Sequence, residues 1–219
     1  MSKLLLFGTG NYSLLMKKYV EQFTDDTIVG FVCHRQYRET PELESLPVFA
    51  MDEVKEKCPP SDVLILPTIG YTKMNTLRAQ VVDELKSMGY RFASFIHPSA
   101  QWYGEAMGEG NIIMERALFC LGSKVGSFNI FCSDSSISHD VMIGDYNFIC
   151  SGAVLSGYIN VGDHSFLGVN STFKNNIDIA DYSLVGAGAY VNQSTSEYSV
   201  TVPAKSITVK NMNSMDIEI

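Results

Sequence analysis

Apolar residues recur at every sixth position through the second half of the chain. The series runs without an insertion from Val125 to Val191 and extends backwards to Met107. A period of six is a multiple of the strand period of two and matches a helix poorly. It therefore predicts a parallel β-helix of stacked coils. The leading residues, expected to point inward, are Val125, Phe131, Ile137, Ile143, Ile149, Leu155, Val161, Leu167, Phe173, Ile179, Val185 and Val191.

A longer period of eighteen residues lies inside the first. The segment Val125–Asn129 has counterparts beginning at Ile143, Val161 and Ile179, and Met107 opens the series. Eighteen residues are three hexads, so each coil has three short sides and a roughly triangular section. The position after each leading residue is often small, as close backbone packing at a turn requires.

Residues 1–95 follow a different pattern, in which short apolar runs alternate with helical periodicity. Strands alternating with helices predict a small α/β domain, Rossmann-like, with a parallel sheet covered on both faces. We divide the chain into this domain, a β-helix over 96–205 and a tail over 206–219 that packs outside the prism or ends as a short helix. The expected strands are Leu4–Gly8, Ile28–Cys33, Asp62–Pro67 and Arg91–Ile96, and the expected helices are Tyr12–Gln22, Met51–Lys57 and Thr72–Met88.

Composition excludes several classes of protein. The net charge of −8 argues against non-specific nucleic-acid binding, which needs clustered Lys and Arg. No apolar run approaches the ~20 residues of a membrane span, and Leu4–Phe7 is too short for a signal-peptide core. We therefore expect a cytoplasmic protein. The five cysteines are scattered without a CxxC pair, which favours free thiols over disulfides or a metal site.

Ligands of parallel α/β sheets sit at the carboxyl ends of the strands, and two loops lie there. The first, Gly8–Ser13, is a G-x-G-x-x-S turn that either receives a phosphate or is simply a tight turn; we expect Gly10 to need a positive φ. The second is Ile69–Asn75, followed by Arg78, whose guanidinium meets a phosphate or solvent. The substrate-binding candidates are Gly8, Gly10, Asn11, His34, Lys73 and Asn75.

The hexads, together with the segment Ile137–Gly144, the junction Ile96–Ala100 and the segment Val202–Lys205, resemble the hexapeptide-repeat sugar acetyltransferases. Within that group the chain is similar to the sialic-acid O-acetyltransferases and the nucleotide-amino-sugar N-acetyltransferases. The resemblance implies a left-handed β-helix, although parallel crossovers in general favour the right hand. It also implies acetyl-CoA as co-substrate, no metal, and a homotrimer with the active site between neighbouring prisms.

His139 is the main catalytic candidate. Its hexad position predicts an outward side chain, which alone fits either a solvated histidine or a functional one. The resemblance implies that His139 is the general base, with Asp140 beside it as a catalytic partner. Some relatives carry a second histidine in the coil that follows the catalytic one, at the position where this chain has Phe148. We interpret His164 as a packing residue in the column of Phe128, Tyr146 and Tyr182, and His97 as part of the domain junction.

The resemblance also implies a groove for the pantetheine arm of acetyl-CoA along Gly157, Val169 and Ala187. Gly157 lies one coil above His139 and can offer a backbone N–H to an oxyanion. Lys205 meets a CoA phosphate or is a solvated tail lysine. We expect the outward aromatic residues Phe128, Tyr146 and Phe148 to supply the trimer interface.

These observations favour an acetyl-CoA-dependent N-acetyltransferase acting on a nucleotide-linked amino sugar in bacterial surface-glycan (lipopolysaccharide) biosynthesis. O-acetylation of a sugar such as sialic acid is the alternative reaction. A non-catalytic sugar-nucleotide-binding protein is the alternative without chemistry. A γ-type carbonic anhydrase shares the prism but needs three zinc-binding histidines, and only His139 and His164 lie within the coils.

Overall fold

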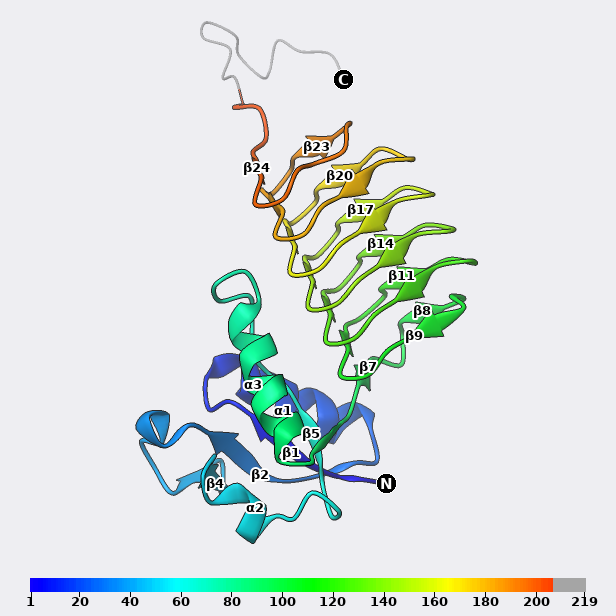
Figure 1. Ribbon diagram of the computed structural model, residues 1–219. Helices are drawn as coiled ribbons and strands as arrows, with labels where there is room; N and C mark the ends of the chain where they lie inside the picture. Colours follow the sequence, from blue (N-terminus) through cyan, green and yellow to red (C-terminus); the bar gives the residue numbers. More distant parts are fainter. Residues whose placement is uncertain (207–219) are drawn as a thin grey trace, which may run out of the picture.

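The computed structural model describes residues 1–206, which form an α/β sheet domain followed by a stack of triangular coils (Figure 1). The first sheet has the strand order β3-β4-β2-β1-β5-β6, parallel except for the β3–β4 pair. Its strands are β1 (Lys3–Phe7), β2 (Thr27–Cys33), β3 (Glu42–Leu43), β4 (Leu46–Ala50), β5 (Leu64–Leu66) and β6 (Arg91–Phe92). The helices are α1 (Asn11–Phe23), η1 (Arg35–Tyr37), α2 (Val54–Lys57) and α3 (Thr76–Ser87).

Alternation along β1 explains how the sheet is covered on both faces. Leu4 and Leu6 pack with Met16 of α1 in one core, whereas Leu5 packs with Val82 of α3 in the other. Successive side chains of a strand point to opposite faces, so a continuous apolar run buries both. The predicted parallel sheet between helices is confirmed for this part of the chain.

The predicted last strand, Arg91–Ile96, is wrong as a single element. It divides into β6, which pairs with β5, and β7 (Phe95–Ile96), which pairs with a strand of the β-helix. The chain therefore leaves one sheet and starts the other within four residues. The hairpin of β3 and β4 was not expected, because its short strands have no clear alternation. Helices α2 and α3 are also shorter than predicted.

Residues from β7 onward build three parallel sheets, which we call faces 1, 2 and 3 in the order in which each coil visits them. Face 1 contains β7, β10 (Ile112–Ile113), β13 (Ile130–Phe131), β16 (Phe148–Ile149), β19 (Phe166–Leu167), β22 (Leu184–Val185) and β24 (Val200–Thr201). Face 2 contains β8 (Gln101–Trp102), β11 (Leu118–Phe119), β14 (Ser136–Ile137), β17 (Val154–Leu155), β20 (Thr172–Phe173) and β23 (Tyr190–Val191). Face 3 contains β9 (Ala106–Met107), β12 (Lys124–Val125), β15 (Met142–Ile143), β18 (Asn160–Val161) and β21 (Asp178–Ile179).

The hexad leaders form the core of the prism, as predicted. Every leader from Val125 to Val191 is buried, and together they make one apolar cluster. From β9 to β23, stacked strands pair at a spacing of eighteen residues, for example Ile137 with Leu155. The first coil is one residue short on face 2, where Trp102 pairs with Phe119. The stacked parallel sheets fit a left-handed β-helix.

The edges between faces hold the turns. We name them the 1–2, 2–3 and 3–1 edges, after the faces they join. Many corner residues have a positive φ, including Asp140 (56°) on the 2–3 edge and His164 (59°) on the 3–1 edge. Inside the 3–1 edge a buried ladder joins Asn111, Asn129 and Asn147, each accepting an N–H of the next coil through its Oδ1. The ladder satisfies polar groups that the tight corner buries.

The α/β domain packs against face 1 and the 3–1 edge of the prism. Ile112, Ile130 and Phe148 belong to the same apolar cluster as α1, and Phe128 joins the cluster of α3. Phe128 is only 1% exposed and Phe148 9%. The expectation that Phe128, Tyr146 and Phe148 supply a trimer interface is therefore wrong, because these rings are used within the chain.

Beyond Val191 the chain makes one more partial coil, in which β24 pairs with β22. The predicted tail, 206–219, lies almost entirely outside the described residues, and its packing stays a prediction.

Candidate functional site

His139 lies on the 2–3 edge, between β14 and β15. Its side chain is 56% exposed, as the hexad position predicted. The imidazole Nδ1 lies 2.9 Å from Oδ2 of Asp140, the next residue. Asp140 has a positive φ at this corner. With Nδ1–H donating to the carboxylate, the lone pair of Nε2 is free for an incoming proton.

Two glycines make room for this pair. A Cβ added to Gly157, one coil above, would lie 2.5 Å from Cε1 and 2.6 Å from Nε2 of His139. A Cβ added to Gly122, one coil below, would lie 2.5 Å from Oδ1 of Asp140. The ring of Tyr158 meets His139 edge-on, with 5.0 Å between centroids. The imidazole is thus held between bare backbone, an aromatic ring and a carboxylate.

This arrangement can perform general base catalysis. An exposed imidazole whose Nδ1 is held by a carboxylate can accept a proton from a nucleophile at Nε2. Within residues 1–206, the N–H of Gly157 donates to no backbone carbonyl, whereas that of Tyr158 donates to the carbonyl of His139. The Gly157 N–H is therefore available beside the ring, where an oxyanion needs a donor.

The other predicted acetyl-CoA contacts lie away from His139 in a single chain. Val169 and Ala187 stand one coil apart on the 1–2 edge, and both are exposed. Face 2 separates that edge from Gly157 on the 2–3 edge. Lys205 is exposed near the carboxyl end of the described chain. One chain therefore brings together only His139, Asp140 and Gly157 of the predicted catalytic and acetyl-CoA residues.

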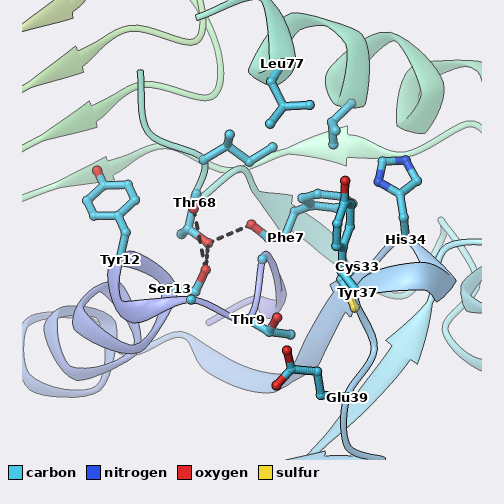
Figure 2. Close-up of a pocket in the computed structure, with 14 residues that line it drawn as sticks. Phe7, Thr9, Tyr12, Ser13, Cys33, His34, Tyr37, Glu39, Thr68 and Leu77 are labelled. Atoms are coloured by element: carbon cyan, nitrogen blue, oxygen red, sulfur yellow. Dashed lines mark hydrogen bonds between the residues drawn. The ribbon is translucent and has the colours of Figure 1, made fainter. Parts of the chain in front are cut away.

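A second candidate site is a cavity of about 390 Å³ at the carboxyl ends of β1, β2 and β5 (Figure 2). Of the predicted substrate-binding residues, Gly8, Gly10 and His34 line it. The Nε2 of His34 lies 2.9 Å from Oε2 of Glu84. Ligand sites of α/β proteins commonly have this position and size.

The backbone roles of the two glycines differ from expectation. Gly10 has a φ of −83° as the N-cap of α1, so the predicted positive φ is wrong. Gly8 instead has a φ of 124°, and a Cβ there would lie 2.5 Å from Oγ of Ser13. Ser13 is buried and shares a 2.7 Å hydrogen bond with Oγ1 of Thr68. Gly8 therefore makes the tight turn, and Gly10 leaves open space at the helix N-terminus.

The remaining substrate candidates do not line the cavity. Asn11 and Lys73 are exposed outside it. Asn75 is fully buried, and its Nδ2 donates to the carbonyls of His164 and Ser165. Asn75 is therefore wrong as a substrate contact. The sequence could not predict the hydrogen bonds of Asn75, because their acceptors lie about ninety residues further along the chain.

Arg78 is also wrong as a phosphate contact. Arg78 is 1% exposed, and its guanidinium donates to five backbone carbonyls at 2.9–3.1 Å. Two of them, Ile69 and Gly70, belong to the loop after β5, and three belong to the 3–1 edge of the prism. Burial without a carboxylate partner lowers the pKa of Arg78 to about 10. Arg78 is a clamp between the two parts of the chain.

The other histidines have structural positions, as predicted. His164 stacks between Tyr146 and Tyr182, with ring centroids 5.1 and 4.8 Å away. Burial lowers the pKa of His164. His97 is buried at the junction, where Nδ1 lies 2.8 Å from Oγ of Ser99 and Phe23 packs on the ring.

The cavity and His139 lie on different sides of one molecule. The α/β domain covers face 1 and the 3–1 edge, whereas His139 stands on the 2–3 edge, which is opposite face 1 in a triangular prism. A ligand bound in the cavity of one chain therefore faces away from the His139 of the same chain.

The pattern analysis missed several residues of the cavity. Tyr37 and Glu39 follow β2 in and after η1, and Thr68 and Leu77 approach from β5 and α3. Tyr37 and Glu39 lie in a stretch without periodicity, so only their place just beyond a strand end pointed to them.

Among residues 1–206, no group of three or more His, Cys, Asp and Glu side chains is arranged to hold a metal ion. The helices of this part of the chain are all too short or too polar to cross a membrane.

No protein-family model and no curated protein matches this sequence. Solved structures do match. A mutant of perosamine N-acetyltransferase from Caulobacter crescentus, in complex with CoA and GDP-perosamine, has a TM-score of 0.80 and 20% identity over 92% of this chain and 94% of that chain. The acetyltransferase domain of PglB from Neisseria gonorrhoeae, in complex with acetyl coenzyme A, has a TM-score of 0.77 and 22% identity over 94% of this chain and 98% of that chain.

WeeI from Acinetobacter baumannii has a TM-score of 0.77 and 21% identity over 91% of this chain and 96% of that chain. These matches cover both the α/β domain and the coils. Over more than nine tenths of its length, this chain has the fold of these structures, one of which is a perosamine N-acetyltransferase.

Proposed function

We propose that this chain is an acetyl-CoA-dependent N-acetyltransferase acting on a nucleotide-linked amino sugar. The observation that carries the proposal is the exposed His139–Asp140 pair, with the backbone of Gly157 against its imidazole. Structures of the same fold contain acetyl coenzyme A, or CoA together with GDP-perosamine. Those complexes support the choice of both substrates.

His139 is the general base in this proposal. The sugar amine attacks the thioester carbonyl of acetyl-CoA while its proton passes to Nε2 of His139. The N–H of Gly157 stabilises the oxyanion of the tetrahedral intermediate. The carbon–sulfur bond then breaks, and the CoA thiolate takes the proton from the imidazolium. Asp140 keeps Nδ1 protonated and stabilises the imidazolium while it exists.

The α/β domain, over about residues 1–95, is the sugar-nucleotide domain, and its cavity holds the nucleotide. Gly8, Gly10 and His34 line that cavity. Helix α1 begins beside it with an open Gly10 and no acidic residue in its first turn. Backbone N–H groups at such a helix start suit a diphosphate. Asn11 and Lys73 are exposed and do not line the cavity, so they can contact only parts of the substrate that extend out of it.

The β-helix, over about residues 96–205, binds acetyl-CoA between two copies of the chain. The pantetheine arm runs past Gly157 of one copy and past Val169 and Ala187 on the 1–2 edge of the next. Lys205 meets a CoA phosphate. The separation of these residues within one chain, and of the cavity from His139, is what requires a second copy.

A homotrimer satisfies these requirements with one closed symmetry. Three prisms side by side place each 1–2 edge next to a neighbouring 2–3 edge, and they form three equivalent sites. The exposed apolar side chains Leu121, Met142, Val154, Val169 and Tyr190 lie on face 2, its edges and the adjoining strand of face 3. Burying such a surface stabilises association.

We place the reaction in the cytoplasm, in the synthesis of a bacterial surface glycan such as lipopolysaccharide. The acceptor decides between this proposal and its alternatives. Transfer to a sugar hydroxyl identifies an O-acetyltransferase, and nucleotide binding without thiol release identifies a binding protein.

The test is release of free thiol from acetyl-CoA, measured against a panel of nucleotide-linked amino sugars and their hydroxyl counterparts. We expect turnover with an amine, and His139→Ala to lower kcat by about 10²–10⁴-fold. Asp140→Asn should cost less, because the base remains. Acetyl-CoA binding and oligomeric state, measured alongside, should survive both changes. Near-wild-type turnover by His139→Ala at neutral pH contradicts the assignment of the base.

A further inference from the structure

Glu39 is the acidic residue that lines the cavity of the α/β domain. It is the one Asp or Glu side chain lining the cavity within the described residues, and no Lys or Arg lines it there. The two neighbouring arginines bind other carboxylates: Arg35 pairs with Asp52 at 2.8 Å and Arg38 with Glu53 at 2.8 Å. The cavity therefore presents an acceptor-only group that no neighbouring cation neutralises.

Tyr37 lines the same cavity, and Figure 2 shows the Glu39 side chain below it, beside Thr9. Tyr37 is 62% exposed. The His34 ring meets the Tyr37 ring edge-on, with 6.4 Å between centroids, and itself meets Phe7 edge-on at 5.7 Å, so His34 supports the Tyr37 ring on one side. An exposed and supported ring offers a face on which a nucleobase can stack, whatever the base.

We propose that Tyr37 and Glu39 select the nucleoside half of the substrate: Tyr37 stacks on the base, and Glu39 accepts hydrogen bonds from two adjacent donors of the nucleoside. This inference rests on the proposed function, because it assigns the cavity to the nucleotide. It adds the residues that determine specificity and the chemistry they read.

The donor chemistry follows from the carboxylate. An ionised carboxylate accepts two parallel hydrogen bonds and donates none. Two parts of a nucleoside offer two adjacent donors. One is the 2′,3′-diol of ribose, and the other is the N1–H and N2–H₂ edge of guanine. Uracil and thymine offer a single N–H that lies between two carbonyl oxygens. The carboxylate repels these two oxygens, so it favours guanine over either base.

The experiment measures the dissociation constants of GDP, UDP and 2′-deoxy-GDP by calorimetry, for the full chain and for Glu39→Gln. Gln has the size of Glu but keeps one acceptor oxygen and adds a donor. If Glu39 binds the guanine edge, Glu39→Gln lowers the preference for GDP over UDP about tenfold or more. The preference for GDP over 2′-deoxy-GDP then stays unchanged. If Glu39 binds the ribose diol, Glu39→Gln lowers the preference for GDP over 2′-deoxy-GDP and leaves the preference for GDP over UDP unchanged.

Two further variants complete the design. Glu42→Gln is the matched control, because Glu42 is an exposed carboxylate of β3 outside the cavity, and both preferences should stay unchanged. Tyr37→Ala should weaken all three nucleotides about equally, by roughly tenfold, because stacking does not distinguish bases.

The outcomes separate this inference from the proposed function. Nucleotide binding by the wild type, with both preferences unaltered in Glu39→Gln, overturns the role of Glu39 and leaves the proposed function in place. Failure of the wild type to bind any nucleotide overturns both. Equal binding of all nucleotides by Tyr37→Ala and the wild type overturns the stacking role.

Discussion

At the scale of single residues, the catalytic candidate depends as much on missing side chains as on those present. His139 and Asp140 can bond side by side because Gly157 and Gly122 leave the space above and below them empty. The hexads predicted that the side chain of His139 points outward and that Gly157 lies one coil above it. They did not predict the ring of Tyr158 or the fit of Gly122 under Asp140, because these depend on rotamers at the corner.

Gly157→Ala tests this fit directly. Gly157 does not have a positive φ, so Ala suits its backbone and the fold should survive. The new Cβ would lie 2.5 Å from the imidazole and must displace it from its bond with Asp140. We expect kcat to fall about tenfold or more, with little change in the midpoint of thermal unfolding, because a small displacement of a catalytic group is costly.

The control is a double-mutant cycle. If the methyl group acts through the imidazole, Gly157→Ala should have almost no effect on residual turnover in a His139→Ala background. An equal loss in both backgrounds would show that Gly157 acts on acetyl-CoA instead, through its N–H or through the groove.

At the scale of elements, the α/β domain and the coils were predictable because both follow simple periods. Apolar runs gave β1, β2 and β5, and the hexads gave most strands of the prism. The boundaries failed where tertiary contact decides, as at Arg91–Ile96, which serves two sheets. Asn75 was predicted to contact substrate, and Arg78 to meet a phosphate or solvent, because no sequence pattern distinguishes a polar residue that binds a ligand from one that binds another part of the chain.

Arg78 carries a prediction at this scale. Arg78→Met keeps much of the side-chain volume but leaves five buried carbonyl groups without their donor. We expect the free energy of unfolding to fall by about 2–4 kcal/mol, because buried polar groups without partners are costly. Urea unfolding at fixed protein concentration measures it.

Arg91→Met is the matched control for this measurement. Arg91 is an exposed residue of β6, so its replacement should change the free energy of unfolding by no more than about 0.5 kcal/mol. Equal stability of Arg78→Met and Arg91→Met would contradict the clamp.

At the scale of the whole molecule, the cavity and His139 face different directions, and the proposed site needs two chains. This can be tested with two inactive variants. His139→Ala removes the base, and Gly10→Phe projects a ring into the cavity without backbone strain, since Gly10 has a negative φ and open space around it. Unfolding the two together and refolding them should produce mixed oligomers.

In an equal mixture, about one quarter of the sites should combine an intact cavity with an intact His139, if chains associate at random and each site joins two neighbours. Turnover should therefore recover to about a quarter of wild type, although neither variant is active alone. Light scattering checks that the mixture is trimeric. Absence of recovery in a trimeric mixture would place the cavity and His139 of one site in the same chain.

The eighteen-residue register has a consequence for how such proteins diverge. The His139–Gly157 geometry is set by the step from one coil to the next, and that step is eighteen residues for every pair of stacked strands from β9 to β23. A whole coil gained or lost above Gly157 therefore leaves the distance between His139 and Gly157 unchanged, and the coil below them that is one residue short leaves their register intact. The length of the prism can therefore change by whole coils without a change in the contact between these two residues.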